Sequence, residues 1–315
     1  MSHDLTGTIV PVVTPFSADE SFDARAMAKL IDYVIGEGAD ALMPTALTGE
    51  GLLLSPDETL GVWDVVFESA AGRLPVVPAI LSLTTRLAVD LTRAASTRGA
   101  AAAMVAPILP ELYARRSQDE VIAFYSEVAS VTTLPLILFN YPSLTGVDLL
   151  PPLVERLSEI PTVRYIKESS GDSRRVHQIQ RAVGERIAVV CGAPDTALES
   201  IALGCRAWIT GILNIAPRSG RQLMTAAERS EMELARRIYY RQILPLVDEM
   251  AGNNNPTGTI KAGLGARGVE VGAPRRPGRP LAGEPERRVV ELVGEITQAE
   301  LEMEPRLAEG RHSRP

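Results

Sequence analysis

The chain has 315 residues, of which 45% are hydrophobic and 23% charged, and its formal net charge is −7. This composition is typical of a soluble globular protein, and the acidic balance argues against nucleic acid or an anionic membrane as the main partner. Two cysteines, Cys191 and Cys205, are too few for a disulfide framework. The N-terminus lacks the pattern of a signal peptide, and no apolar stretch is long enough to span a bilayer. We therefore expect a cytoplasmic protein.

Short apolar runs alternate with longer segments of helical periodicity. The runs are apolar throughout, which is typical of parallel strands that are buried on both faces. A helix is expected to begin after Ser55, because Ser-Pro followed by acidic residues is a capping signature. Other helices are expected to end at glycines such as Gly38, Gly72 and Gly99. The predicted strands cover 7–13, 41–45, 75–80, 101–106, 134–140, 162–167, 187–192 and 206–211, and the clearest helices among them cover 23–38, 55–72, 84–99 and 117–131.

Eight β-then-α units fit a (β/α)8 barrel better than a doubly wound sheet, which usually has fewer. We predict an α/β protein of the TIM-barrel class in which the barrel occupies residues 1–229. Residues 230–302 form a C-terminal helical extension, with helices over 231–251, 256–266 and 286–302 and a Pro/Gly/Arg-rich connection between the last two. Residues 303–315 are expected to be a flexible tail.

Lys167 ends the sixth predicted strand, and chemistry in such barrels sits at the carboxyl ends of the strands. The chain has 32 Lys and Arg residues, but only Lys29, Lys167 and Lys261 are lysines. An ammonium facing an apolar interior loses hydration, its pKa falls, and the neutral amine can condense with a ketone to form an imine. The alternative is a structural lysine that pairs with Glu168 or Asp172 or reaches the rim of the barrel.

The segment "TALTGEG" (45–51) follows the second strand. A turn that contains Thr48, Gly49 and Glu50 can direct backbone N–H groups and a hydroxyl at an anion, for which a carboxylate is the expected guest. The alternative is an ordinary connection between a strand and a helix. The segment "LILFNYPSLTG" (136–146) follows the fifth strand, and by spacing alone it is equally compatible with a polar, proline-fixed turn.

Together with "YIKE" at 165–168, these two segments resemble the dihydrodipicolinate synthase/N-acetylneuraminate lyase family of class I aldolases. The likeness runs from "GTIVPVVTPF" to "NPTGTIKAGL", with the motifs in the family's order and spacing. It implies a (β/α)8 barrel with a C-terminal helical segment in a homo-oligomer, a tetramer or a dimer. It places the family's Schiff-base lysine at Lys167 and its carboxylate-binding pair at Thr48 and Gly49. Leu47, Phe139 and Ile209 complete the substrate-binding candidates.

The chain departs from the family pattern around this site. Leu47 replaces the first hydroxyl residue of the turn, and Phe139 replaces the family's proton-shuttling tyrosine. Leu144 stands where synthases have an arginine that binds the carboxylate of the second substrate. In the family a tyrosine pair commonly follows the proline after the fourth strand, and this chain has Leu109 there. The usual hydroxyl relay is therefore missing, so we do not expect the dihydrodipicolinate synthase reaction itself. We name Tyr113 as a catalytic candidate that replaces the relay, with Tyr141 as an alternative.

The sequence thus predicts a lyase that acts on pyruvate or a longer 2-oxo acid through an imine at Lys167. Aldol cleavage or condensation of 2-keto-3-deoxy-sugar acids, dehydration and deamination all remain open. The apolar replacements predict a second substrate or leaving group that is less charged than an amino-acid semialdehyde. A hypothesis of another class is a barrel that has lost turnover and only binds a 2-oxo acid.

No cofactor or metal is expected. The sequence "GLGARG" (263–268) matches G-x-G-x-x-G, but it ends a helical stretch and follows no strand, so it does not indicate a dinucleotide site. His3, His177 and His312 are scattered and have no zinc-ligand spacing. The expected partner is a small 2-oxo acid, with no nucleic acid and no membrane.

Overall fold

The computed structural model describes residues 5–106 and 116–309, with the backbone alone for 305–309. Eight parallel strands form one sheet in the order β2-β1-β8-β7-β6-β5-β4-β3. Each strand overlaps its predicted segment, and all except β6 are shorter than predicted. The strands are β1 Gly7–Val10, β2 Ala41–Leu42, β3 Ala79–Ile80, β4 Ala103–Val105, β5 Leu136–Asn140, β6 Val163–Glu168, which has the predicted length but is shifted by one residue, β7 Ala188–Cys191 and β8 Ala207–Ile209.

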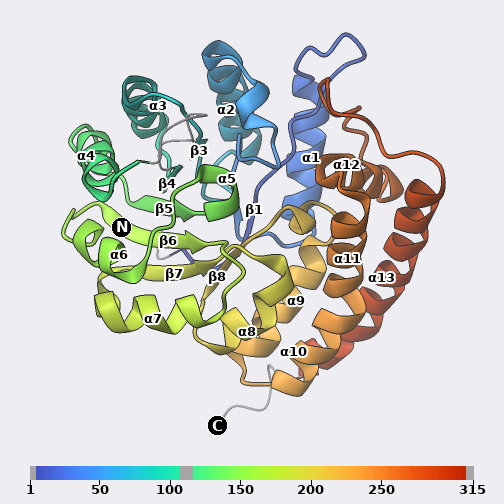
Figure 1. Ribbon diagram of the computed structural model, residues 1–315. Coiled ribbons are helices and arrows are strands. Elements are labelled where there is room, and N and C mark those ends of the chain that lie inside the picture. The colour runs from blue at the N-terminus through green and yellow to red at the C-terminus, as the bar shows by residue number, and fades with distance from the viewer. Residues whose placement is uncertain (1–4, 107–115, 310–315) are drawn as a thin grey trace.

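Backbone hydrogen bonds close the sheet into a ring between β2 and the segment that precedes β3. The Leu42 N–H donates to the Pro75 carbonyl at 3.0 Å, and the Val77 N–H donates to the Leu42 carbonyl at 2.8 Å. Leu42 and Val76 form an isolated parallel bridge at this seam. A closed ring of eight parallel strands surrounded by helices is a (β/α)8 barrel, so the predicted fold class is confirmed (Figure 1).

Helices follow the strands and cover the outside of the barrel (Figure 1). Helix α2 begins with the predicted capping box: the Glu58 N–H donates to Ser55 Oγ, and the Ser55 N–H donates to Glu58 Oε2. Gly38, Gly72 and Gly99 have the positive φ expected after a helix end. The barrel helices are α1 Ala24–Gly36, α2 Pro56–Ala70, α3 Thr85–Thr97, α4 Gln118–Ala129, α5 Pro142–Thr145, α6 Pro151–Leu157, α7 Arg174–Val183, α8 Ala197–Ala202 and α9 Pro217–Glu228, with single turns η1 Gly51–Leu53, η2 Gly184–Arg186, η3 Pro194–Thr196 and η4 Gly211–Asn214.

The remaining helices stack on one side of the barrel (orange to red in Figure 1). They are α10 Met232–Ile238, the π-helical turn η5 Tyr239–Ile243, α11 Leu244–Asn253, α12 Pro256–Ala266 and α13 Glu284–Glu309. Helix α13 therefore continues through residues 303–309, which the sequence assigns to a tail. In the described part of the chain, no helix has the length and apolarity needed to cross a membrane.

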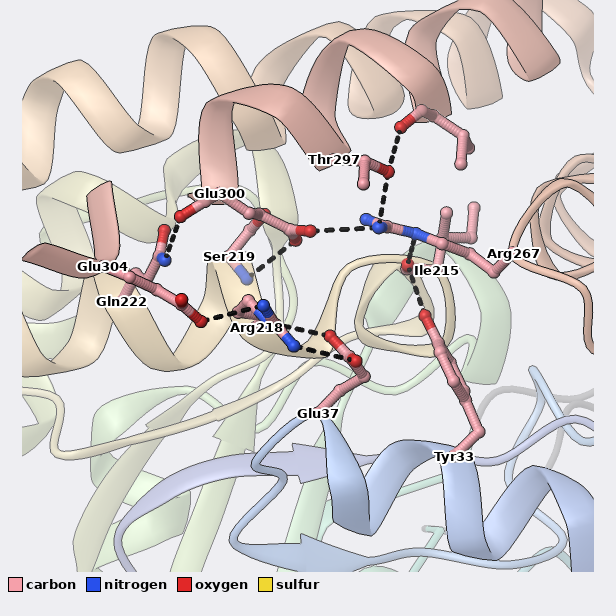
Figure 2. Close-up of polar contacts among 11 residues, drawn as sticks. Tyr33, Glu37, Ile215, Arg218, Ser219, Gln222, Arg267, Thr297, Glu300 and Glu304 are labelled. Carbon is pink, nitrogen blue, oxygen red and sulfur yellow. Dashed lines mark hydrogen bonds and ion pairs between the residues drawn. The ribbon is translucent and has the colours of Figure 1, made fainter. Parts of the chain in front are cut away.

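A buried polar network fastens α13 to the barrel (Figure 2). The Glu300 carboxylate accepts from Ser219 Oγ of α9 at 2.6 Å and pairs with Arg267 after α12 at 3.0 Å. Arg267 Nε and the Tyr33 hydroxyl of α1 both donate to the Ile215 carbonyl. Nearby, Arg218 bridges the C-terminal end of α1 and α13 through Glu37 and Glu304. The first and last helices of the chain are therefore joined by one set of contacts.

Two apolar clusters fill the molecule. The larger one lies between the strands and the helices. The smaller one, here called the interior cluster, takes every second strand residue, because successive side chains of a strand point to opposite faces. Its buried members are Leu5, Ile9, Ala41, Met43, Ala46, Val77, Ala79, Ala102, Met104, Ala106, Ile137, Phe139, Tyr165, Val190, Ala207 and Ile209.

Candidate active site

Lys167 lies inside the barrel near the carboxyl end of β6. It follows Tyr165 of the interior cluster by two residues, so its side chain points to the same face of the strand. In the sheet register it is flanked by Phe139 of β5 and Val190 of β7, which both belong to the interior cluster. Its Nζ is 4.8 Å from the centre of the Phe139 ring. The amine therefore lies next to the aromatic ring of Phe139 inside the barrel.

Burial lowers the pKa of Lys167 to about 8, and the nearby Cys191 opposes that shift. Within the described residues, Nζ has no hydrogen bond and no ion pair. The two carboxylates that could have neutralised it are engaged elsewhere: Asp172 pairs with Arg174 at 2.8 Å, and Glu168 faces away from the barrel interior. The interpretation of Lys167 as one half of a structural ion pair with either residue is therefore wrong.

Glu168 belongs to a polar network on the outer side of β5 and β6 that the sequence analysis missed. Its carboxylate accepts from Asn140 Nδ2 at 2.8 Å and from the Ser170 N–H at 2.6 Å. Asn140 also reaches Asp148, which Arg175 binds through two nitrogens. Asn140 and Glu168 are register partners at the ends of adjacent strands. A polar residue at the end of each of these two apolar strands was the sequence signal that could have indicated the network. The network fixes the strand end that carries Lys167.

Gly192, after β7, leaves room for the lysine stem. A Cβ at this position would lie 2.8 Å from Lys167 Cγ, 2.8 Å from the Glu168 carbonyl oxygen and 2.0 Å from Ser169 Oγ. Real side chains do not approach backbone so closely, so this position requires glycine. The Ser169 hydroxyl is buried and has no hydrogen-bond partner in the described part of the chain.

The turn after β2 places Thr48 and Gly49 at the same end of the barrel. Thr48 is half-buried, and its Oγ1 would be 3.0 Å from a Cβ at Gly211, after β8. The Gly49 carbonyl is held by the Thr14 hydroxyl at 2.6 Å. Neither the Thr48 nor the Gly49 N–H donates to another group among the described residues. Two N–H groups and one hydroxyl thus remain for an anion.

Glu50 does not join this anion-binding group, because its N–H donates to the Leu47 carbonyl within the turn at 2.9 Å. Its backbone is left-handed, with φ 54°, and its carboxylate turns outward to Lys261 of α12 at 2.9 Å. Both side chains are almost completely buried, and Lys261 also donates to the Thr14 and Ala273 carbonyls. The three lysines thus differ: Lys29 is exposed, Lys261 is paired, and Lys167 is unpaired.

The predicted apolar residues of the site come together. Phe139 and Ile209 are buried in the interior cluster, and Leu47 and Leu144 are half-buried and pack against it. The Tyr141 ring packs edge-on against the Phe139 ring, with 6.1 Å between the ring centres, and Tyr141 is partly exposed. Tyr113 lies outside the described residues.

A cavity of about 1020 Å³ opens at the opposite end of the barrel. It is lined by residues that precede β2 and β8, such as Gly38 and Cys205, and by Arg218 and Gln222 of α9. Lys167 and Thr48 lie at the other ends of their strands, so this cavity is not their site. Across the described ranges, His, Cys, Asp and Glu side chains form no group of three that could hold a metal.

Known proteins resemble the chain along nearly its whole length. The model of the dihydrodipicolinate synthetase family matches residues 4–296. A 4-hydroxy-tetrahydrodipicolinate synthase from Exiguobacterium is 32% identical over 93% of this chain and 98% of its own, and one from Pseudomonas aeruginosa is 34% identical over 80% and 85%. A chloride-inhibited dihydrodipicolinate synthase from Acinetobacter baumannii, solved with pyruvate, superposes with a TM-score of 0.86 at 30% identity over 93% of this chain and all of its own.

Sequence likeness of this extent and a shared barrel lead to the same assignment. The resemblance first drawn from three short motifs holds across the chain, and this protein belongs to the dihydrodipicolinate synthetase family.

Proposed function

We propose that this protein is a lyase that acts on pyruvate or a longer 2-oxo acid through a Schiff base at Lys167. The observation that carries the proposal is the amine itself: it lies inside the barrel mouth, it has no counter-ion among the described residues, and its pKa is lowered to about 8. At pH 7 about one-tenth of such amines are neutral, against about one in 3,000 for an ordinary lysine. Family membership and a relative solved with pyruvate support the same chemistry.

The site can bind a 2-oxo acid at two points. The Thr48 hydroxyl and the N–H groups of Thr48 and Gly49 donate hydrogen bonds to the carboxylate, and the ketone carbon next to it comes within reach of the Lys167 amine. Attack by the amine and loss of water give a protonated imine. This imine withdraws electrons from the neighbouring carbon, so a bond to that carbon can break or form.

We propose that the reaction is not that of the relatives named 4-hydroxy-tetrahydrodipicolinate synthase. The ring of Phe139 lies next to the amine and has no hydroxyl with which to move a proton. Tyr141, whose ring contacts Phe139 and is partly exposed, is a described phenol that can take that part.

Reductive trapping tests the imine. The protein is incubated with pyruvate, reduced with borohydride, digested and analysed by mass spectrometry. We expect the mass of a reduced pyruvate adduct on the peptide that contains Lys167. Absence of an adduct, or an adduct only at Lys29 or Lys261, contradicts the proposal.

The rate of imine formation should depend on pH. The folded pKa of Lys167 is about 8, and the reactive form is the neutral amine, so the rate rises as pH increases through this value. Between pH 6 and pH 8 we expect an increase of about 50-fold, followed by a plateau above pH 9. The measurement is kcat/KM or the trapping rate, with circular dichroism to show that the fold is constant. A midpoint near 10.5 would show an ordinary lysine.

A second candidate function is a 2-oxo-acid-binding protein without turnover, which the missing hydroxyl at Phe139 favours. Exchange of the methyl protons of pyruvate in D2O separates the two. An imine that converts to its enamine should exchange these protons at least about 100-fold faster than Lys167→Met under the same conditions. Trapped imine without such exchange would instead identify a binder.

A further inference from the structure

The mouth of the barrel carries a set of leucines beside the amine. Leu47 follows β2, Leu81 follows β3, and Leu144 lies on α5 after β5. All three pack against the interior cluster and remain half-buried. Because they follow the carboxyl ends of three different strands, they lie at the same end of the barrel as Phe139 and Lys167. We refer to these three residues as the leucine rim.

In the part of the chain that the structure describes, the charged residues that follow β2 and β6 are engaged with other groups. Glu50 is paired with Lys261, and Glu168 is bound by Asn140. The nearest arginines after β6 are also engaged, Arg174 by Asp172 and Arg175 by Asp148. Among the inward-facing strand residues that the structure describes, Lys167 alone carries a charge, and its nitrogen is bonded to C2 of the substrate once the imine forms.

The described residues of the site therefore offer one place for one carboxylate, at Thr48 and Gly49, and an apolar surface for the rest of the substrate. A second charged or heavily hydroxylated group would lose its hydration against leucine side chains without gaining a partner. An apolar group would instead be removed from water by the same side chains.

We propose, building on the function proposed above, that the substrates are 4-hydroxy-2-oxo acids whose C4 substituent is an uncharged hydrocarbon group. Lys167 condenses with the C2 ketone and releases water. The C4 hydroxyl gives its proton to water as the C3–C4 bond breaks, an apolar aldehyde leaves, and the bonding electrons pass into the imine to give an enamine. Protonation at C3 and hydrolysis release pyruvate and the free lysine. The reverse sequence joins the same aldehyde to pyruvate.

Two substrates that differ only at C4 test the inference. One is 4-hydroxy-2-oxo-4-phenylbutanoate, and the other is 4-hydroxy-2-oxopentanedioate, which has a carboxylate at C4. Pyruvate release is followed with lactate dehydrogenase. We expect kcat/KM to be at least about 10-fold higher for the phenyl compound. Equal values, the opposite order, or no cleavage of the phenyl compound by protein that traps pyruvate overturns the inference. Failure to trap pyruvate at all overturns the proposed function as well.

A charge placed on the leucine rim should reverse the preference. Leu144→Arg provides a partner for a C4 carboxylate, so the phenyl-to-dicarboxylate ratio of kcat/KM is expected to fall at least about 10-fold. Leu150→Arg is the matched control, because Leu150 is an exposed leucine at the start of α6. It should leave the ratio unchanged. Leu81→Gln tests the rim a second time by lowering the rate for the phenyl compound. Borohydride trapping of pyruvate should persist in all three variants. If the phenyl-to-dicarboxylate ratio is unchanged in both Leu144→Arg and Leu81→Gln, the leucine rim does not set the substrate preference.

Discussion

Replacement of Lys167 by methionine or arginine is expected to abolish turnover, with kcat/KM lower by at least about 1,000-fold. Methionine keeps the unbranched stem but has no amine. Arginine keeps the charge but stays protonated at every pH at which the protein is folded, so it cannot attack a carbonyl. Neither variant should give a borohydride-trapped pyruvate adduct.

Stability distinguishes this loss from misfolding. Lys167 is a cation with lowered pKa in apolar surroundings, so Lys167→Met should unfold at the same or a higher urea concentration than the native protein. Lys29→Arg, on the exposed face of α1, is the control and should retain full activity. If Lys167→Met keeps more than a tenth of the native kcat/KM, the assignment of the nucleophile is wrong.

Breaking the ion pair between Lys261 and Glu50 should have the largest effect on stability. Lys261→Met leaves the Glu50 carboxylate buried without its counter-ion and frees the Thr14 and Ala273 carbonyls. Removal of one partner of a buried pair costs about 3–5 kcal/mol, and urea unfolding would measure it. Glu50→Gln should cost a similar amount.

A double-mutant cycle isolates the pair. The double variant Lys261→Met/Glu50→Gln should lose much less than the sum of the two single variants, because neither charge is left alone. The control is Arg93→Met, which removes an exposed pair with Asp90 and should leave the unfolding midpoint nearly unchanged. If Lys261→Met is no more destabilising than this control, the pair does not anchor the turn after β2.

Sequence patterns predicted the barrel because fully apolar strands and capped helices follow from local composition. Strand boundaries were less accurate. Residues 75–80 were predicted as one strand, but only Ala79–Ile80 is regular, because Pro75 and Pro78 accept hydrogen bonds and have no N–H to donate. Helix α13 extends past its predicted end and continues through Pro305 to Glu309, just before Gly310.

Site residues that belong to short sequence motifs could be predicted, whereas side-chain orientations that depend on contacts with distant parts of the chain could not. Lys167, Thr48 and Gly49 were named from short segments, and the structure places them at the same end of the barrel. The outward turn of Glu50 depends on Lys261, far along the chain, and no local pattern indicates it. The role of Tyr113 stays a prediction.

The network that joins α1 to α13 also sets the order in which the molecule can be completed during translation. Tyr33 and Glu37 leave the ribosome early, whereas Glu300 and Glu304 are among the last residues to be made. A nascent chain that has emerged only as far as α9 holds Arg218 and Ser219 without their carboxylate partners on α13. The contacts that join α1 to α13 are therefore completed only when the last helix has been made.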